Sequence, residues 1–266
     1  SDVDHGAGPL AARVIVNRLW HHHFGRGIVA TPNDLGTQGE KPTHPELLEW
    51  LATRLVEQKW SLKSIHRLIV TSATYRQSGT VDDARRTQDP DNSLLWHFRP
   101  VRLEGEVIRD ALLAVSGRLD AAMYGPSVVG ASVPRRSIYM RVKRSEPEAF
   151  LRVFDQPEPI QSIGARGVAT IPTQALTMMN DPLVRSAADG LADRARKAVG
   201  DDDTQAIEYC FRVALSRPPS PDEVGRFTGF LSAREEAADA DGANRLAALS
   251  DACHLMLCLN EFIYVD

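Results

Sequence analysis

The chain has 266 residues, of which 43 % are apolar and 25 % are charged, a composition typical of one large globular domain or two closely packed ones. Its formal net charge of −4 gives no indication of a nucleic-acid partner, and no stretch reaches the ~18 apolar residues of a membrane span. The charge is uneven: residues 13–76 contain 9 Lys and Arg against 5 Asp and Glu, whereas residues 201–266 contain 5 against 13. This asymmetry would steer an anionic ligand to residues 13–76, although two differently solvated faces also explain it.

Helix signals dominate the sequence. Apolar residues recur at intervals of three and four, and prolines, glycines and capping residues separate the periodic segments. Boxes of the type Ser/Thr-x-x-Glu are expected to begin helices near Thr43, Ser145 and Ser220. The predicted helices span, in chain order, residues 9–24, 43–58, 61–77, 103–115, 145–154, 172–180, 182–199, 203–216, 220–237 and 244–262.

Strand signals are few. Residues 136–142 (RSIYMRV) alternate best, with Ile138, Met140 and Val142 on one side. Strands do not alternate with helices, which excludes a parallel sheet. The sequence therefore predicts a mainly α, multi-helix globular domain with a minor β-hairpin near residues 136–142. We expect a main helical domain over residues 1–181 that carries a polar site, and a C-terminal helical subdomain over residues 182–266 packed on it.

The stretch from Ala12 to Gly36 (ARVIVNRLWHHHFGRGIVATPNDLG) combines chemically capable side chains with apolar ones more densely than any other part of the chain. Its three consecutive histidines, His21 to His23, raise the hypothesis of a metal site. Neighbouring residues of a helix point about 100° apart, so the three side chains fan over about 200° and cannot hold one ion.

A metal site would instead need His22 or His23 to meet Asp34, His44 or His66 from separate elements. The spacings H-x-x-x-H and H-E-x-x-H do not occur. We therefore predict neither a bound metal nor a cofactor in this chain. The alternative interpretation is that His23 and His66, which lie on predicted apolar faces, are buried neutral histidines with satisfied hydrogen bonds.

Acid–base catalysis and anion binding are the other chemistries that these residue types allow. A histidine oriented by Asp34 or Asp155 would exchange protons near neutral pH. Four arginines are candidates for a bidentate clamp on a carboxylate, phosphate or sulfate, namely Arg18, Arg26, Arg76 and Arg166. Structural ion pairs with Asp or Glu are the competing interpretation for these arginines.

Several enzyme classes lack their motifs, because neither the nucleophile elbow G-x-S-x-G nor a phosphate-binding glycine loop is present. The three cysteines, Cys210, Cys253 and Cys258, lie in apolar helical runs and are expected in the core; one disulfide from Cys210 to either of the others stays open. The tryptophans are expected to serve core packing rather than sugar stacking: Trp20, Trp50, Trp60 and Trp96.

The runs ARVIVNRLWHHHFGRGIVATPNDLG, PTHPELLEWLA and WSLKSIHRLIVTSATYRQS, with later pieces such as RLEGEVIRDALLAVSGRLD, FDQPEP, IPTQALTMMNDPLV and LNEFIYVD, resemble a C-terminal domain of unknown function. That domain occurs in large exported planctomycete proteins that often carry a cytochrome-c-like module. The resemblance implies an exported (periplasmic or cell-surface) multidomain protein whose partners are the other domains of the same polypeptide. It also implies that any haem lies on another domain, because C-x-x-C-H is missing here.

The preferred hypothesis is an accessory domain that binds a polar ligand, either anionic or a saccharide. Two alternatives stay open: a polysaccharide hydrolase or lyase that uses a His/Asp pair, and a structural or electron-transfer partner of a haem module. The sequence assigns no reaction. The candidate ligand-binding residues are Arg18, His22, His23, Arg26, Asn33, Asp34, His44, His66, Arg76, Asp155 and Arg166.

Overall fold

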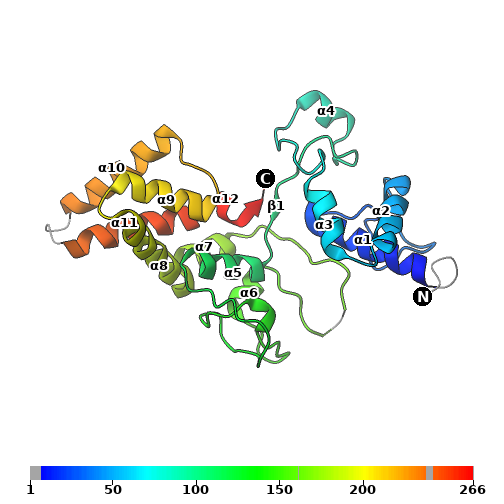
Figure 1. The fold of residues 1–266 in the computed structure, drawn as a ribbon, viewed down its shortest axis with the longest axis horizontal. Helices are drawn as coiled ribbons and strands as arrows, with labels where there is room; N and C mark the ends of the chain where they lie inside the picture. The colour runs from blue at the N-terminus through cyan, green and yellow to red at the C-terminus, as the bar shows by residue number, and fades with distance from the viewer. Residues whose placement is uncertain (1–6, 161, 238–241, 266) are drawn as a thin grey trace. The chain divides into compact units, whose positions relative to one another are not determined.

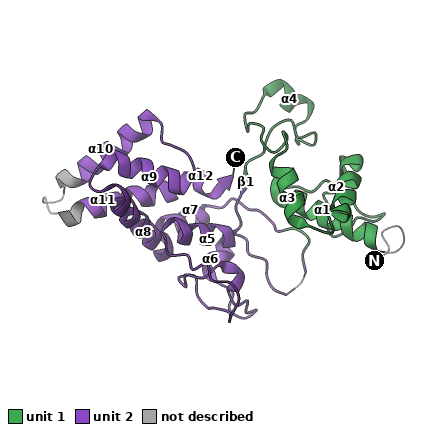
Figure 2. Ribbon diagram, viewed as in Figure 1, with its two compact units in different colours: residues 1–101, 163–165, 266 green, residues 102–162, 166–265 purple. Residues whose placement is uncertain are grey.

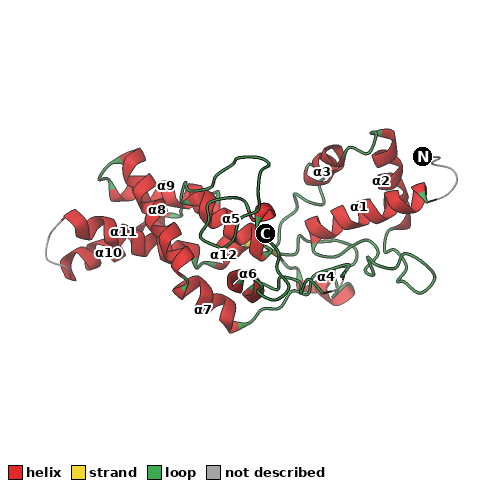
Figure 3. Ribbon diagram, turned by 90° about the horizontal axis from the view of Figure 1, so that it is seen from below, coloured by secondary structure: helices red, strands yellow, loops and turns green. Residues whose placement is uncertain are grey.

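The computed structural model describes residues 7–160, 162–237 and 242–265, which form mainly helices (Figure 1, Figure 3). The mainly α fold is confirmed. The helices are α1 (Gly8–Phe24), α2 (Pro45–Glu57), α3 (Leu62–Val70), α4 (Asp83–Gln88), α5 (Gly105–Val115), α6 (Ala149–Val153), α7 (Pro172–Asn180), α8 (Pro182–Val199), α9 (Asp203–Leu215), α10 (Pro221–Ala237), α11 (Gly242–Leu257) and α12 (Asn260–Ile263), with the 3₁₀-helix η1 (Ser137–Tyr139). The strands β1 (Val101–Arg102) and β2 (Tyr264–Val265) pair in a two-stranded sheet. None of the helices in the described ranges is both long and apolar enough to cross a membrane.

The chain divides into two compact units (Figure 2). The first contains the described residues up to Val101 together with Ile163–Ala165, and the second contains those of Arg102–Ser162 and Arg166–Val265. We expected a boundary between residues 181 and 182. That boundary stays a prediction. The two compact units divide between residues 101 and 102, and α8 packs directly against α5 within the second unit.

The first unit is organised around α1, which packs against α2 and α3. Asn17 of α1 is fully buried, and its side-chain amide pairs with the backbone of Val29. Its Nδ2 donates to the Val29 carbonyl oxygen at 2.9 Å, and its Oδ1 accepts the Val29 N–H at 2.8 Å. A Cβ at Gly27 would lie 2.5 Å from the Val29 oxygen, so a glycine is needed for this close approach. The loop after α1 is thereby fixed to the helix.

The second unit has a separate core, built largely from α5, α8, α9 and α11. Its helix starts follow the predicted signals. Asp181 Oδ1 accepts the N–H of Leu183 at 2.8 Å and caps α8. Ser220 and Glu223 form the predicted capping box before α10, with the Ser220 N–H donating to Glu223 Oε2 at 2.7 Å and the Glu223 N–H donating to Ser220 Oγ at 3.3 Å.

The other two predicted capping boxes are wrong. Thr43 is bound to the preceding loop, because its N–H and its hydroxyl both donate to the Ile28 carbonyl oxygen, so His44 takes the N-cap position of α2 without a side-chain cap. The helix expected from Ser145 begins only at Ala149, with Glu148 at its N-cap.

The strand predicted at residues 136–142 is also wrong, since this segment contains η1. The Ser137 N–H donates to Asp110 Oδ1 of α5 at 2.8 Å, which binds the segment to a helix. Among the described residues, its strand-like pairing is limited to one isolated parallel bridge between Val128 and Met140. Ile138 and Val142 are 76 % and 66 % exposed, so the apolar alternation does not mark a buried face. The small sheet joins β1 and β2, which lie far apart in the sequence, and is not a hairpin.

Two helices end earlier than their periodicity predicts. α3 stops at Val70, where the hydroxyls of Thr71 and Ser72 donate to the carbonyl oxygens of Arg67 and Ile69 and compete with the helical pattern. The predicted helix 244–262 is divided into α11 and α12.

Candidate functional site

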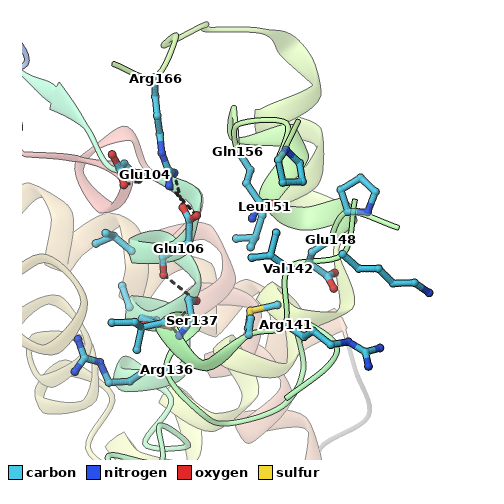
Figure 4. Close-up of a pocket in the computed structure, with 18 of the residues that line it drawn as sticks. Glu104, Glu106, Arg136, Ser137, Arg141, Val142, Glu148, Leu151, Gln156 and Arg166 are labelled. Atoms are coloured by element: carbon cyan, nitrogen blue, oxygen red, sulfur yellow. Dashed lines mark hydrogen bonds and ion pairs between the residues drawn. The ribbon is translucent and has the colours of Figure 1, made fainter. Parts of the chain in front are cut away.

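A cavity of about 720 Å³ in the second unit lies over α5 (Figure 4). One side is the exposed face of α5, from Glu104 to Ala114. The other side is formed by the wall segment, which we define as residues 118–143, together with α6 and Arg166. A cavity of this size lies within the range of sites for small organic ligands. We call it the α5 pocket.

An arginine–carboxylate pair lines the α5 pocket. Arg166 Nη1 and Nη2 donate to the two carboxylate oxygens of Glu106 at 2.6 and 2.9 Å, and Glu104 Oε2 lies 3.4 Å from Nη1 (Figure 4). Burial raises the pKa of Glu106, but the hydrogen bonds and charge of Arg166 outweigh burial and hold it below its usual value. Glu106 is therefore an ionised acceptor near neutral pH.

A second polar cluster attaches the wall segment to α5. Arg109 is fully buried, and its guanidinium donates to the carbonyl oxygens of Ala131, Val133 and Arg135 and to Ser137 Oγ. Ser137 Oγ in turn donates to Asp110 Oδ1 at 2.7 Å. One charged side chain thus satisfies acceptors from four residues of an otherwise irregular segment, and it fixes the position of the wall.

Between these polar clusters the lining is apolar. Val107, Ile138 and Val142 line the pocket and are 46 %, 76 % and 66 % exposed, and Leu151 of α6 is a buried residue of the lining. Exposed aliphatic side chains gathered around a few fixed polar groups are the usual composition of a small-ligand site.

Of the predicted site residues, the structure brings His23 and His66 together. His23 Nε2 lies 2.8 Å from His66 Nδ1, and the ring of Tyr75 packs edge-on against His23. His23 is half-buried, and burial, followed by the charges of His66 and His22, lowers its pKa. His66 is exposed, so the interpretation of it as a buried histidine is wrong.

The other candidates of the first unit have local roles. Arg26 lies 3.4 Å from Glu40, and Asp34 Oδ1 accepts the Gly36 N–H at 2.8 Å. His44 Nδ1 lies 2.9 Å from the Thr43 hydroxyl. The side chain of Asn33 packs against Gly164, where it leaves no room for a Cβ. Three further candidates have exposed positions, namely Arg18, His22 and Arg76.

The two candidates of the second unit, Asp155 and Arg166, are both ion-paired. Asp155 Oδ2 accepts from Arg102 Nη2 and from the Ala169 N–H at 3.0 Å, and its backbone adopts φ +60°. Arg102 is buried, and its Nε and Nη1 have no hydrogen-bond partner within the described part of the chain. Arg166 alone of the predicted set lines the α5 pocket.

The sequence analysis missed the carboxylates and the buried arginine that build this pocket. A signal was present, because Arg109 lies three residues before Leu112 on the buried stripe of α5, at a position where an apolar residue is expected. A charged residue there indicates a buried polar network. Across the described residues, no three His, Cys, Asp or Glu side chains lie close enough together to hold a metal ion.

Comparison with known proteins gives one match. No curated protein and no solved structure matches the chain. The model of one family, described as PSD1, a protein of unknown function (DUF1553), matches residues 3–231. Because this match covers most of the 266 residues, the chain belongs to the DUF1553 family of unknown function.

Proposed function

We propose that this domain binds a small, uncharged, hydroxyl-rich ligand, a saccharide unit, in the α5 pocket. The observation that carries the proposal is the bidentate Arg166–Glu106 pair in the lining of a cavity of about 720 Å³. Each carboxylate oxygen of Glu106 accepts one hydrogen bond from Arg166 and keeps a further lone pair for a hydroxyl donor. The apolar side chains of Val107 and Leu151 suit the C–H face of a sugar ring.

The charges of the lining favour a neutral ligand over an anion. Four carboxylates line the pocket, on Glu104, Glu106, Asp110 and Glu148. Arg136, Arg141 and Lys143 also belong to the lining, but Lys143 Nζ donates to Glu146 Oε2 at 2.7 Å. Figure 4 shows the guanidinium groups of Arg136 and Arg141 pointing away from the Arg166–Glu106 pair. An anion in the pocket would therefore face several negative groups with one guanidinium already engaged.

Binding is favoured over the two alternatives. The hydrolase hypothesis needs a histidine bound to Asp34 or Asp155, yet the hydrogen bonds that the structure shows for these carboxylates go to backbone N–H groups, Arg102 and Gln174. The described lining of the α5 pocket contains no histidine. The electron-transfer hypothesis predicts an exposed surface patch without a pocket. The presence of the α5 pocket therefore does not favour this hypothesis.

The test uses cellotriose, maltotriose and xylotriose as probes, with saturation-transfer NMR on the whole chain. Val107→Trp fills the pocket from an exposed position of α5, so it is compatible with folding. We expect at least one trisaccharide to bind and Val107→Trp to abolish its signal. Val14→Trp, on an exposed position of α1, is the matched control and leaves binding unchanged. Absence of binding by all three probes, or equal loss in both variants, rejects the proposal.

The resemblance described above supports a second part of the proposal: the domain is exported and acts beside other domains of a longer polypeptide, such as a cytochrome-c-like module. Fractionation of the source cells with an antibody against this domain tests it. Recovery of the antigen with the cytoplasmic proteins alone would reject export.

A further inference from the structure

A second recess lies in the first unit, between α2 and α3, with a volume of about 640 Å³. We call it the α2–α3 groove. Trp50 and Arg54 face it from α2, and Lys63 and Arg67 face it from α3. Each pair is spaced i, i+4, which places its two side chains on one face of its helix. Leu68 also lines the groove and provides apolar surface between the two pairs.

The described residues that line this groove include three cations and no carboxylate. Arg54 Nη1 donates to Glu57 Oε2 at 2.9 Å, and both side chains are exposed. Lys63 and Arg67 are exposed, and neither has an ion-pair partner within the described ranges. By contrast, Arg13 of the same unit is paired with Glu49 at 2.6 Å, and Arg26 lies 3.4 Å from Glu40. The groove therefore presents positive charge that the fold itself does not neutralise.

Trp50 adds an aromatic ring to this charge. It is 44 % exposed, so the expectation that it serves core packing is wrong. The Arg54 guanidinium lies 5.5 Å from the centre of its ring and holds it beside the groove. A large exposed ring next to fixed cations is typical of a recognition surface, because it gains much contact area at a small cost in side-chain entropy.

We propose that the α2–α3 groove binds an acidic saccharide chain, one that carries sulfate or carboxylate groups. Lys63 and Arg67 lie one helical turn apart and engage neighbouring acidic groups of the chain, while the Trp50 ring packs against a sugar face. A single exposed ring and three cations suit a short acidic saccharide better than a nucleic acid, which calls for an extended basic surface and stacking for successive bases. This site lies in the other unit from the α5 pocket and does not depend on it.

Isothermal titration of the whole chain with a heparin tetrasaccharide at low ionic strength tests the proposal, with cellotetraose as the uncharged probe. We expect the heparin fragment to bind and cellotetraose not to bind in the groove. The double variant Lys63→Gln/Arg67→Gln should weaken binding by about tenfold, because two charge-assisted contacts are lost. Trp50→Leu should weaken it by about fivefold, because the stacking surface is removed.

Two controls make the result specific. Arg85→Gln/Arg86→Gln removes the same charge from the exposed face of α4 and should change the affinity by less than about twofold. Val107→Trp blocks the α5 pocket and should leave heparin binding unchanged, so failure of one site is distinguishable from failure of the other. The proposal is overturned if the tetrasaccharide does not bind, or if the α4 variant weakens binding as much as the groove variant. It is also overturned if a thymidine hexanucleotide binds the same residues equally tightly.

Discussion

Replacing Arg109 by methionine is expected to release the wall segment from α5. Methionine fills much of the volume of the arginine stem but donates no hydrogen bond. The carbonyl oxygens of Ala131, Val133 and Arg135 would lose their donor, and Asp110 would lose a neighbouring charge. At about 1 to 1.5 kcal/mol for each of the three orphaned carbonyls, the free energy of unfolding of the second unit should fall by about 3 to 4.5 kcal/mol.

Urea unfolding followed by far-UV circular dichroism measures this loss. The four tryptophans lie at positions 20, 50, 60 and 96, all in the first unit, so their fluorescence reports on the other core separately. Trypsin should also cleave the variant faster within the wall segment, after Arg118 or Arg141. Arg136→Met, at an exposed position of the same segment, is the control and should leave both measurements unchanged. A change below about 1 kcal/mol, with unaltered proteolysis, would refute this account of the wall.

Three further predictions concern titration and thiol reactivity. Arg217 donates to Glu223 and holds the pKa of that carboxyl at about 2 instead of 4.5. Glu223 therefore stabilises the fold above pH 4.5, and this contribution is lost as pH falls from 4.5 to 2. In acid unfolding followed by circular dichroism, Glu223→Gln should reduce the loss of stability over that pH range. The lowered pKa of His23 makes the fold less stable as pH falls below about 6.5, and His23→Gln should remove this dependence in urea titrations at several pH values. Burial of Cys210 and Cys253 should protect both thiols from Ellman's reagent in the native protein, so half-buried Cys258 should be the first to react; rapid labelling of all three would contradict this.

Features encoded by neighbouring residues could be predicted from the sequence. The helix beginning at Asp181-Pro182 and the capping box at Ser220 need only contacts within a few residues, and both are confirmed. The segment around Ile138 failed, since its alternation is local but its conformation depends on Asp110, which lies 27 residues before Ser137. Local patterns specify local hydrogen bonds, and tertiary contacts override them where a stronger partner exists.

The candidate site was harder to predict from the sequence, because its residues meet only through tertiary contacts. The histidines were predicted as site residues from their residue type. The structure shows His66 exposed and within hydrogen-bond distance of His23. The carboxylate of Glu106 and the guanidinium of Arg166, separated by 60 residues, meet only in the folded chain. Arg166 was among the candidates, whereas its partner was not, because no short motif links them.

The attachment of the wall segment also bears on how this family can diversify. Arg109 binds mainly backbone carbonyl oxygens, which every residue type supplies, rather than particular side chains. Residues of the wall whose side chains only line the pocket, such as Ile138 and Val142, are therefore free to change without loss of the anchor. Relatives that keep an arginine at this position could then share this wall while their pockets select different ligands, as antibodies keep one framework and exchange their binding loops.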